Sequence, residues 1–391
     1  MSGKENKMRI TEDIVYIGVN DHKIKFFEGQ YAVTNGMAYN SYLIKDEKTA
    51  VMDSVDAAFT QRWLDNIAKS LESSHPDYLV VQHMEPDHSA SIIEFTKAYP
   101  NAKIVSSCKA FVMMKNFFGT DFAEKQVAVC EDGALSLGKH QLNFITAPMV
   151  HWPEVIMTYD STDKVLFSAD AFGKFGATDV EDWIHEARRY YIGVVGKYGS
   201  QVQAVLRKIE NMEIEKICSL HGPVLAENID CYLNIYDIWS SYKAEEEGIV
   251  IAYTSIYGNT RKAVMLLAEE LKLNGCEKIV IIDLVYCDWS EAVAEAFRYS
   301  KLVLVTTTYN GSVFPTMKQF IDHLTERNFS NRTVAFMENG SWAPVATKVM
   351  KAMFEKSKNI TFAENTVKII SALNDESTAQ LKELAKELAQ K

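Results

Sequence analysis

Residues 80–95 read VVQHMEPDHSASIIEF, and this stretch places four metal-binding side chains between two apolar runs. His83, Glu85, Asp87 and His88 lie within six positions, with Pro86 among them. A strand that ends in a sharp, proline-containing turn can direct alternate side chains to one point, so His83, Glu85 and Asp87 are expected to converge. Solvated acids or a structural histidine would explain one of these residues but not all four, so the stretch predicts a metal site.

Three later segments offer further ligands, because each places a histidine or an aspartate directly after an apolar strand. MVHWPE contains His151, FSADAFG contains Asp170, and CSLHGPV contains His221. The combined set of imidazoles and carboxylates, without a thiolate, suits divalent iron or manganese better than zinc. Three carboxylates and a hydroxide would neutralise two divalent ions, so a dinuclear centre is expected. The other histidines, His22, His75, His140, His185 and His323, are expected to be structural.

Composition limits the classes of function. The net charge of −11 argues against a nucleic-acid partner. No apolar run approaches the roughly 20 residues of a membrane span, and the opening MSGKENKMRI lacks the apolar segment of a signal peptide. A cytoplasmic protein without membrane association is therefore expected. The six cysteines are scattered without a C-x-x-C pair, which excludes a cysteine-bound iron–sulfur cluster or zinc knuckle.

The 391 residues are enough for two domains of ordinary size, and the pattern of the chain changes near residue 245. Earlier segments mix short strands with helices such as FTQRWLDNIAKSLES, which indicates two sheets flanked by helices. From about residue 250 strands and helices alternate, as in a doubly wound α/β domain. The polar stretch SYKAEEEG joins the two, so we predict domains at 1–245 and 246–391.

Three loops at strand ends of the second domain predict a binding crevice. YTSIYGNTRKAV joins a strand to a helix, and its backbone N–H groups can receive an anion at the helix N-terminus. It lacks both G-K-S/T and G-x-G-x-x-G, so a monophosphate is favoured, and the aromatic side chains of Tyr309 and Trp342 can cover a flat ring. The residues predicted to bind this ligand are Ser255, Ile256, Tyr257, Gly258, Asn259, Thr260, Thr307, Thr308, Tyr309, Asn310, Gly311, Asn339, Gly340, Ser341 and Trp342.

The segments HMEPDH, HWPE, SADAFG and HGPV resemble the metallo-β-lactamase-like domain of the flavodiiron proteins, also called A-type flavoproteins. The three later loops resemble those of flavodoxin, which binds FMN, so the resemblance covers essentially the whole chain. It implies an α/β protein: a metallo-β-lactamase-like αββα sandwich followed by a flavodoxin-like doubly wound parallel sheet. It also implies two irons, one held by His83, Glu85 and His151, the other by Asp87, His88 and His221, with Asp170 as the bridge. Hydrolases of the wider superfamily carry histidine where this chain has Glu85, and the carboxylate favours iron.

The resemblance implies an oxidoreductase that reduces O2 to water, or NO to N2O, at the diiron centre. FMN would pass electrons from an external donor such as rubredoxin, because the chain has neither a rubredoxin C-x-x-C segment nor a nicotinamide fingerprint. A head-to-tail homodimer, or a dimer of dimers, is also implied, and no catalytic residue is expected beyond the metal ligands. One alternative is a zinc-dependent metallo-β-lactamase-type hydrolase fused to a flavodoxin. The other is a redox carrier whose first domain only docks partners. The sequence leaves the choice between O2 and NO open.

Overall fold

The structure, a computed structural model, describes residues 8–180 and 183–390. The chain forms two compact units, one made of Met1–Tyr191 with Ser200–Asp237 and the other of Ile192–Gly199 with Ile238–Lys391. The predicted domain limits, 1–245 and 246–391, stay a prediction. Among the described residues, no helix combines the length and the apolar character that a membrane crossing requires.

The first unit contains two sheets. One has the strand order β1-β6-β7-β8-β9-β10 and the other the order β11-β12-β13-β14-β15. The strands of the first sheet are β1 (Ile14–Tyr16), β6 (Tyr42–Ile44), β7 (Ala50–Met52), β8 (Tyr78–Val80), β9 (Lys103–Ser107) and β10 (Gln126–Val129). Those of the second are β11 (Ala134–Ser136), β12 (Gln141–Thr146), β13 (Ile156–Asp160), β14 (Val165–Phe167) and β15 (Lys216–Cys218). Two short pairs complete the unit: β2 (Val19–Asp21) with β5 (Met37–Tyr39), and β3 (Phe26–Phe27) with β4 (Tyr31–Ala32).

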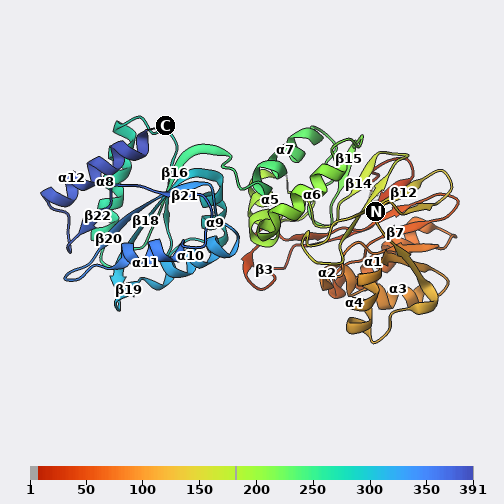
Figure 1. Cartoon of the computed structure of the whole chain (residues 1–391). Coiled ribbons are helices and arrows are strands. Elements are labelled where there is room, and N and C mark those ends of the chain that lie inside the picture. Colours follow the sequence, from red (N-terminus) through yellow and green to blue (C-terminus); the bar gives the residue numbers. More distant parts are fainter. Residues whose placement is uncertain (1–7, 181–182, 391) are drawn as a thin grey trace, which may run out of the picture. The chain divides into compact units, whose positions relative to one another are not determined.

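The two sheets of the first unit share one core. Met52 and Val80 of the first sheet lie in the same buried cluster as Phe144, Ile156 and Phe167 of the second. Helices flank the sheets (Figure 1). They are α1 (Thr60–Leu71), α2 (Pro86–Ser89), α3 (Ile92–Ala98), α4 (Cys108–Phe118), α5 (Ile184–Tyr190), α6 (Gly199–Ile209) and α7 (Ile229–Ser240), with the short helical segments η1 (Ala57–Phe59) and η2 (Ala123–Lys125). The last residues of α7 and nearly all of η3 (Tyr191–Val195) and η4 (Gly196–Tyr198) belong to the second unit. The predicted sandwich flanked by helices is confirmed.

The second unit is a parallel sheet with the strand order β17-β16-β18-β20-β21. Its strands are β16 (Glu246–Tyr253), β17 (Ile279–Asp283), β18 (Tyr299–Tyr309), β20 (Arg332–Asn339) and β21 (Ile360–Phe362). In addition, β19 (Ser312–Val313) pairs antiparallel with β18, and β22 (Val367–Ile369) pairs parallel with β20. Counted along the chain this is the 2-1-3-4-5 order of flavodoxin, which confirms the predicted doubly wound sheet.

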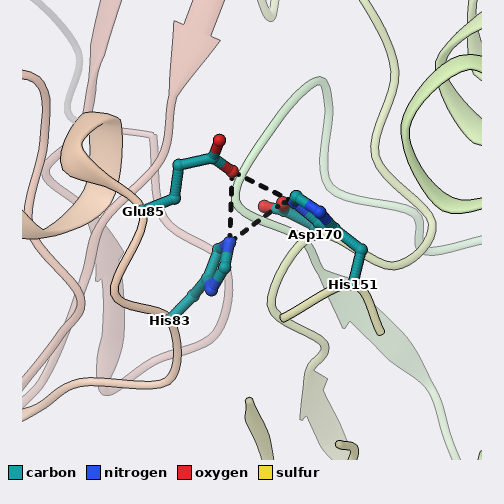
Figure 2. A group of neighbouring side chains, drawn as sticks. All are labelled: His83, Glu85, His151 and Asp170. Atoms are coloured by element: carbon teal, nitrogen blue, oxygen red, sulfur yellow. Dashed lines mark hydrogen bonds and ion pairs between the residues drawn. The ribbon is translucent and has the colours of Figure 1, made fainter. Parts of the chain in front are cut away.

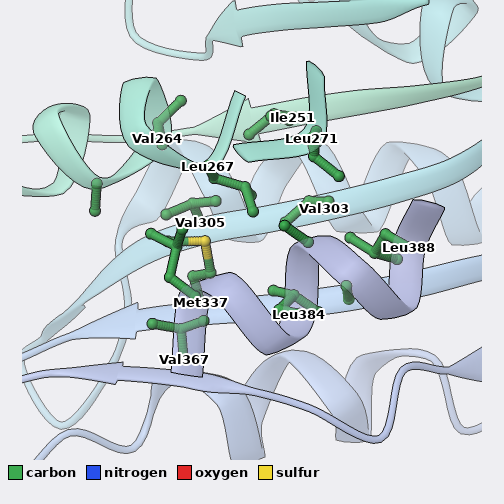
Figure 3. Packing of buried hydrophobic residues seen from close by; sticks show 14 of the residues in the cluster. Ile251, Val264, Leu267, Leu271, Val303, Val305, Met337, Val367, Leu384 and Leu388 are labelled. Carbon is green, nitrogen blue, oxygen red and sulfur yellow. The ribbon is translucent and has the colours of Figure 1, made fainter. Parts of the chain in front are cut away.

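Helices of the second unit hold its loops at the carboxyl edge of the sheet. They are α8 (Asn259–Leu273), α9 (Trp289–Arg298), α10 (Pro315–Glu326), α11 (Ala346–Met353) and α12 (Asp375–Ala389). Leu267 and Leu271 of α8 share a buried cluster with Leu384 of α12 and with Val303 and Val305 of β18 (Figure 3). This packing fixes α8, and therefore places its N-terminus directly after β16.

His140, one of the histidines predicted to be structural, lies between two carboxylates. Its ring is buried, with Nδ1 2.8 Å from Asp160 Oδ2 and Nε2 3.3 Å from Asp13 Oδ2. Burial alone would lower the pKa of His140, but the hydrogen bond to Asp160 and the other nearby carboxylates raise it to about 9. Because the pKa of His140 is higher in the folded than in the unfolded protein, its protonated form stabilises the fold. This stabilisation is complete below the unfolded pKa of about 6.5 and is lost as pH rises through the folded pKa of about 9.

We therefore expect the variant His140→Gln to unfold at a lower temperature than the natural chain at pH 6, by about 2–4 °C. The difference should shrink toward pH 10, because the natural histidine is then neutral as well. Thermal unfolding followed by circular dichroism at the two pH values measures this. A difference that does not change with pH would show that His140 acts by packing and not by charge.

Candidate metal centre and flavin pocket

The seven predicted metal ligands meet in two groups. His83, Glu85, His151 and Asp170 form what we call the first ligand group, and Asp87, His88 and His221 form the second; within each, the ligand atoms lie within 4.8 Å of one another. Each ligand follows a strand: the HMEPDH segment follows β8, and Asp170 and His221 follow β14 and β15. Pro86 is the first residue of α2, where the backbone N–H has no partner within the helix, so proline loses no hydrogen bond there. Asp87 and His88 lie on this single helical turn.

The side chains of the first ligand group point toward one another (Figure 2). His151 Nε2 lies 3.0 Å from Glu85 Oε2 and 3.1 Å from Asp170 Oδ2. His83 Nε2 lies 3.3 Å from Glu85 Oε2 and 3.5 Å from Asp170 Oδ2. Two imidazole nitrogens and two carboxylate oxygens therefore surround one small volume.

The second ligand group adjoins the first through Asp170. His88 Nε2 lies 3.0 Å from His221 Nε2 and 3.2 Å from Asp87 Oδ2. Asp170 Oδ1, the oxygen that does not face His151, lies 3.4 Å from His88 Nε2 and 3.7 Å from His221 Nε2. The two oxygens of one buried carboxylate thus face different ligand groups, which is the arrangement that a carboxylate bridging two metal ions requires.

The unsatisfied atoms of these groups fit metal ions. Both carboxylate oxygens of Asp87 and Oδ1 of Asp170 are buried and lack a hydrogen-bond partner among the described residues. Unpaired buried oxygens are costly, and divalent cations would satisfy them together with the facing imidazoles. Burial alone would lower the pKa of His88, but Asp87 and Asp170 raise it to about 10, so these anions attract positive charge strongly. A bound metal would displace that proton. The mixed nitrogen and oxygen donors fit iron; their role as ligands stays a prediction.

Two contacts orient the ligand histidines, and the sequence did not identify either. His83 Nδ1 lies 2.9 Å from Glu154 Oε1, which also accepts the backbone N–H of Met84 at 2.8 Å. His221 Nδ1 donates to the carbonyl oxygen of Ala38 at 2.7 Å. Because each Nδ1 is engaged in this way, each Nε2 is left to face the ligand group. Glu154 is the last residue of the segment HWPE, but its distance from His83 in the sequence does not indicate that the two side chains are in contact.

We expect Glu154→Gln to weaken metal binding by about 10–100-fold, because the neutral amide no longer holds the His83 ring or strengthens it as a ligand. Competition with a chelator measures the affinity. Glu94→Gln, an exposed acid on α3 that pairs with Lys97, is the matched control and should bind metal as the natural chain does. Equal affinities in the two variants would exclude a role for Glu154 in metal binding.

A cavity of about 600 Å³ lies at the carboxyl edge of the second unit's sheet. Its lining residues are Ile256, Tyr257, Asn259, Thr260, Thr307, Thr308, Tyr309, Asn310, Gly311, Asn339, Gly340, Ser341, Trp342, Ala343, Val345 and Ser371. All of the predicted flavin-binding residues line it except Ser255 and Gly258. The sequence missed Ala343, Val345 and Ser371. Ser371 follows β22, so a search of every strand end would have found it.

Ser255 and Gly258 shape the loop that precedes α8. Ser255 Oγ accepts the backbone N–H groups of Gly258 and Arg261, each at 3.2 Å. Gly258 has φ +90°, a left-handed conformation that a residue without Cβ adopts at little cost. Inside the cavity, Asn339 Nδ2 donates to Thr260 Oγ1 at 3.2 Å, which links the first loop to the third.

The rim of the cavity is aromatic. Tyr257 is 93% exposed and Trp342 is 90% exposed, although both are large and apolar. Such faces are suited to stacking on a flat ring, and the start of α8 supplies N–H groups and a positive dipole end for a phosphate. The residues present therefore fit FMN.

Comparisons with known proteins agree with the two kinds of domain. Residues 37–222 match the family described as ODP family beta lactamase, and residues 248–355 match NADPH-dependent FMN reductase. An anaerobic nitric oxide reductase flavorubredoxin from Vibrio vulnificus is 27% identical, over 86% of this chain and 70% of its own. An uncharacterized protein of Methanocaldococcus jannaschii is 28% identical, over 91% of this chain and 90% of its own.

Solved structures show the same fold over nearly the full length. The rubredoxin oxygen:oxidoreductase of Desulfovibrio gigas aligns with a TM-score of 0.91 at 25% identity, covering 98% of each chain. The flavodiiron protein of Giardia intestinalis aligns with a TM-score of 0.87 at 23% identity, covering 100% of this chain and 97% of its own. The predicted pair of folds is confirmed, and so is the predicted cofactor pair, FMN with a diiron centre. This chain has a metallo-β-lactamase-like unit followed by a flavodoxin-like one, and its relatives and structural neighbours include flavodiiron proteins.

Proposed function

We propose that this protein is a flavodiiron reductase that reduces O2 to water, or NO to N2O, with electrons that enter through FMN. The observation that carries the proposal is the position of Asp170, whose two oxygens face two adjoining ligand groups. A carboxylate that bridges two ions uses both of its oxygens in this way. The names of the relatives support the same reading, because they include a nitric oxide reductase and an oxygen reductase.

His83, Glu85 and His151 are proposed to hold one iron, Asp87, His88 and His221 the other, and Asp170 both. When bound, the irons supply electrons and binding positions for a diatomic gas. The protein excludes water, since His83, His88 and His221 are at most 1% exposed. A hydrolytic zinc site is not favoured, because it would leave the flavin unit without a role and because Glu85 favours a harder ion.

The ring of Tyr190 packs beside the second ligand group. Its ring is buried, 5.5 Å from the His221 ring, and its hydroxyl lacks a hydrogen-bond partner among the described residues. Burial raises the pKa of Tyr190 well above its usual value, and the negative charges of Asp170, Glu85 and Asp87 add to this. The phenol therefore stays neutral and offers its O–H as a donor in the pocket.

Electrons are proposed to come from a small external redox protein such as rubredoxin, in the cytoplasm. The active unit is proposed to be a head-to-tail homodimer or a dimer of such dimers. A two-fold pair presents the flavin edge of each chain to the metal loops of the other with one self-complementary interface, which supports this arrangement. Turnover measured while the protein is diluted through its dissociation range tests the dimer. A monomer with full iron, FMN and activity would contradict it.

The test of function is turnover of each gas with a reduced donor, after anaerobic purification and metal analysis. We expect about two irons and one FMN per chain, consumption of O2 or NO, and water or N2O as the product. Both gases are assayed, because the ligand groups do not distinguish them. Zinc as the dominant native metal, with no gas consumed, would contradict the proposal and favour the hydrolase. Full electron transfer by iron-free protein would favour a simple redox carrier.

A further inference from the structure

The strand β17 forms one edge of the second unit's sheet, and among the described residues its only neighbouring strand is β16. Four aliphatic residues and an aspartate make up β17, in the order IVIID, and none of the five is buried. Proteins usually protect an exposed edge strand with a lysine, a proline or a bulge, and β17 contains none of these. Its backbone is therefore open to pairing with another strand.

Hydrogen bonds to β16 identify the backbone groups of β17 that face outward. The N–H of Ile249 donates to the carbonyl oxygen of Lys278 at 3.0 Å, and the N–H of Leu284 donates to the carbonyl oxygen of Tyr253 at 2.9 Å. Alternate residues of a strand bond to a given neighbour, so the even-numbered residues of this segment face β16. The residues whose backbone groups face away from β16 are Ile279, Ile281 and Asp283.

These three residues are placed symmetrically about Ile281. When a second copy of β17 runs antiparallel across a two-fold axis at Ile281, the two Ile281 residues lie opposite each other and Ile279 lies opposite Asp283. All the outward-facing residues then meet one another. The carbonyl oxygen of Asp283 already accepts the N–H groups of Tyr286 and Cys287, each at 3.1 Å, so Asp283 contributes its N–H, which donates to Ile279 of the second copy. Strand β17 is thus its own complement.

The charges at the two ends of β17 also favour an antiparallel pair. Toward the carboxyl end, a groove of about 400 Å³ is lined by three acids, Asp283, Glu291 and Glu295. At the amino end, a hollow of about 780 Å³ is lined by two lysines and two acids. These four residues are Lys278, Lys301, Glu247 and Glu277. Antiparallel pairing places the acidic groove of one copy beside the lysines of the other, whereas parallel pairing would place the two acidic grooves side by side.

Tyr286 follows β17 and is 87% exposed, and its neighbour Val285 is exposed as well. Because the two strands run in opposite directions, Tyr286 of one copy lies near the start of β17 in the other, where Gly275 and Cys276 line the hollow. Leu273, which ends α8 just before this segment, is 80% exposed. Pairing would cover apolar side chains that a free edge leaves in water.

We propose that β17 is the contact between two copies of this chain, paired antiparallel at Ile281 into one continuous sheet. A two-fold contact uses the same surface on both copies, so it joins two chains and is then complete. The flavin cavity is lined by residues outside β17. The contact is therefore distinct from the head-to-tail dimer, and it supplies the second interface that a dimer of such dimers needs. It does not depend on the reduction of either gas.

The direct test is a disulfide between the two copies in Ile281→Cys. Residues that lie opposite in a hydrogen-bonded antiparallel pair have Cα atoms about 5.5 Å apart, which a disulfide can span. Mild oxidation of the holoprotein should therefore join most Ile281→Cys chains into dimers on a non-reducing gel, and a reductant should separate them. Phe362→Cys, on β21 at the opposite edge of the sheet, is the matched control, because Phe362 is 36% exposed and Ile281 37%. Like the natural chain, whose own cysteines provide the background, it should give few dimers.

Ile281→Lys places two like charges opposite each other at the axis, which should separate the copies. Its mass in solution, measured by light scattering, should be half that of the natural protein at the same concentration. Phe362→Lys should keep the natural mass. Iron content, FMN content and the circular dichroism spectrum should be unchanged in both variants, because both residues lie outside the ligand groups and the flavin cavity.

The contact would be overturned by a natural protein that stays a single chain at every concentration, by an Ile281→Lys variant with the natural mass, or by an Ile281→Cys variant that forms no more covalent dimer than Phe362→Cys. Release of a different bound protein by Ile281→Lys, with the number of copies unchanged, would overturn it as well. None of these results bears on the proposed function, which turnover tests. A natural protein that reduces neither gas would still form the β17 contact.

Discussion

Replacing Asp170 with Asn is expected to remove one or both irons and to lower gas reduction by at least about 100-fold. Asp170 Oδ2 faces His151 while Oδ1 faces His88 and His221, so one substitution takes a negative oxygen from both ligand groups. The amide keeps the volume but carries no charge to offset the two cations. Iron per chain, measured after anaerobic purification, and turnover of both gases test this expectation.

Asp160→Asn is the control for Asp170→Asn, because Asp160 is another fully buried carboxylate of the same unit and pairs with His140. It should lose some stability but keep its iron. FMN should remain bound in both variants, since the flavin cavity is lined only by residues of the second unit. Full iron in Asp170→Asn would contradict the bridge, and loss of FMN there would show that the two units are not independent.

Replacing Thr260 with Leu is expected to weaken FMN binding by at least about 100-fold, on the order of 2.7 kcal/mol. Thr260 lies in the first turn of α8, is 2% exposed and accepts a hydrogen bond from Asn339. Leucine removes the hydroxyl and adds bulk to the place where the phosphate would lie, so the ligand loses a polar contact and meets a steric clash. Flavin released per chain, and the quenching of FMN fluorescence by the flavin-free protein, measure the effect.

Thr378→Leu, in the first turn of α12, is the control for Thr260→Leu, because it makes the same change on another helix of the same unit and does not line the cavity. It should bind FMN normally. Iron should stay in place in both variants. Retained FMN affinity in Thr260→Leu would show that the phosphate does not lie at the start of α8.

The candidate ligand residues could be selected from the sequence because they are chemically distinctive and follow apolar strands. His83, Glu85, Asp87 and His88 are close in the chain, and His151 stands in a short motif of its own after β12. The loops of the flavin cavity follow the same rule, which located every lining residue except Ala343, Val345 and Ser371. Local sequence patterns are sufficient to locate these loops, because side chains at the carboxyl ends of parallel strands meet at one edge of the sheet.

The contacts of Glu154 and Phe27 are ones that local sequence patterns do not predict. His83 and Glu154 are separated by 71 positions, and they meet only because the HMEPDH and HWPE segments end at the same side of the sandwich. Phe27 looks like an ordinary strand residue in the sequence, and its contact with the His221 ring depends on where the β3–β4 hairpin packs.

The sequence by itself determined the types of the two domains, the candidate metal-ligand residues and the loops that can receive a phosphate. Each of these depends on the periodicity of apolar residues or on side-chain chemistry, which are properties of short segments. The tertiary structure decided that Asp170 faces both ligand groups and that Glu154 and Ala38 orient the histidine rings. These depend on strand order and register, which bring distant segments within a few ångströms and which no short segment encodes.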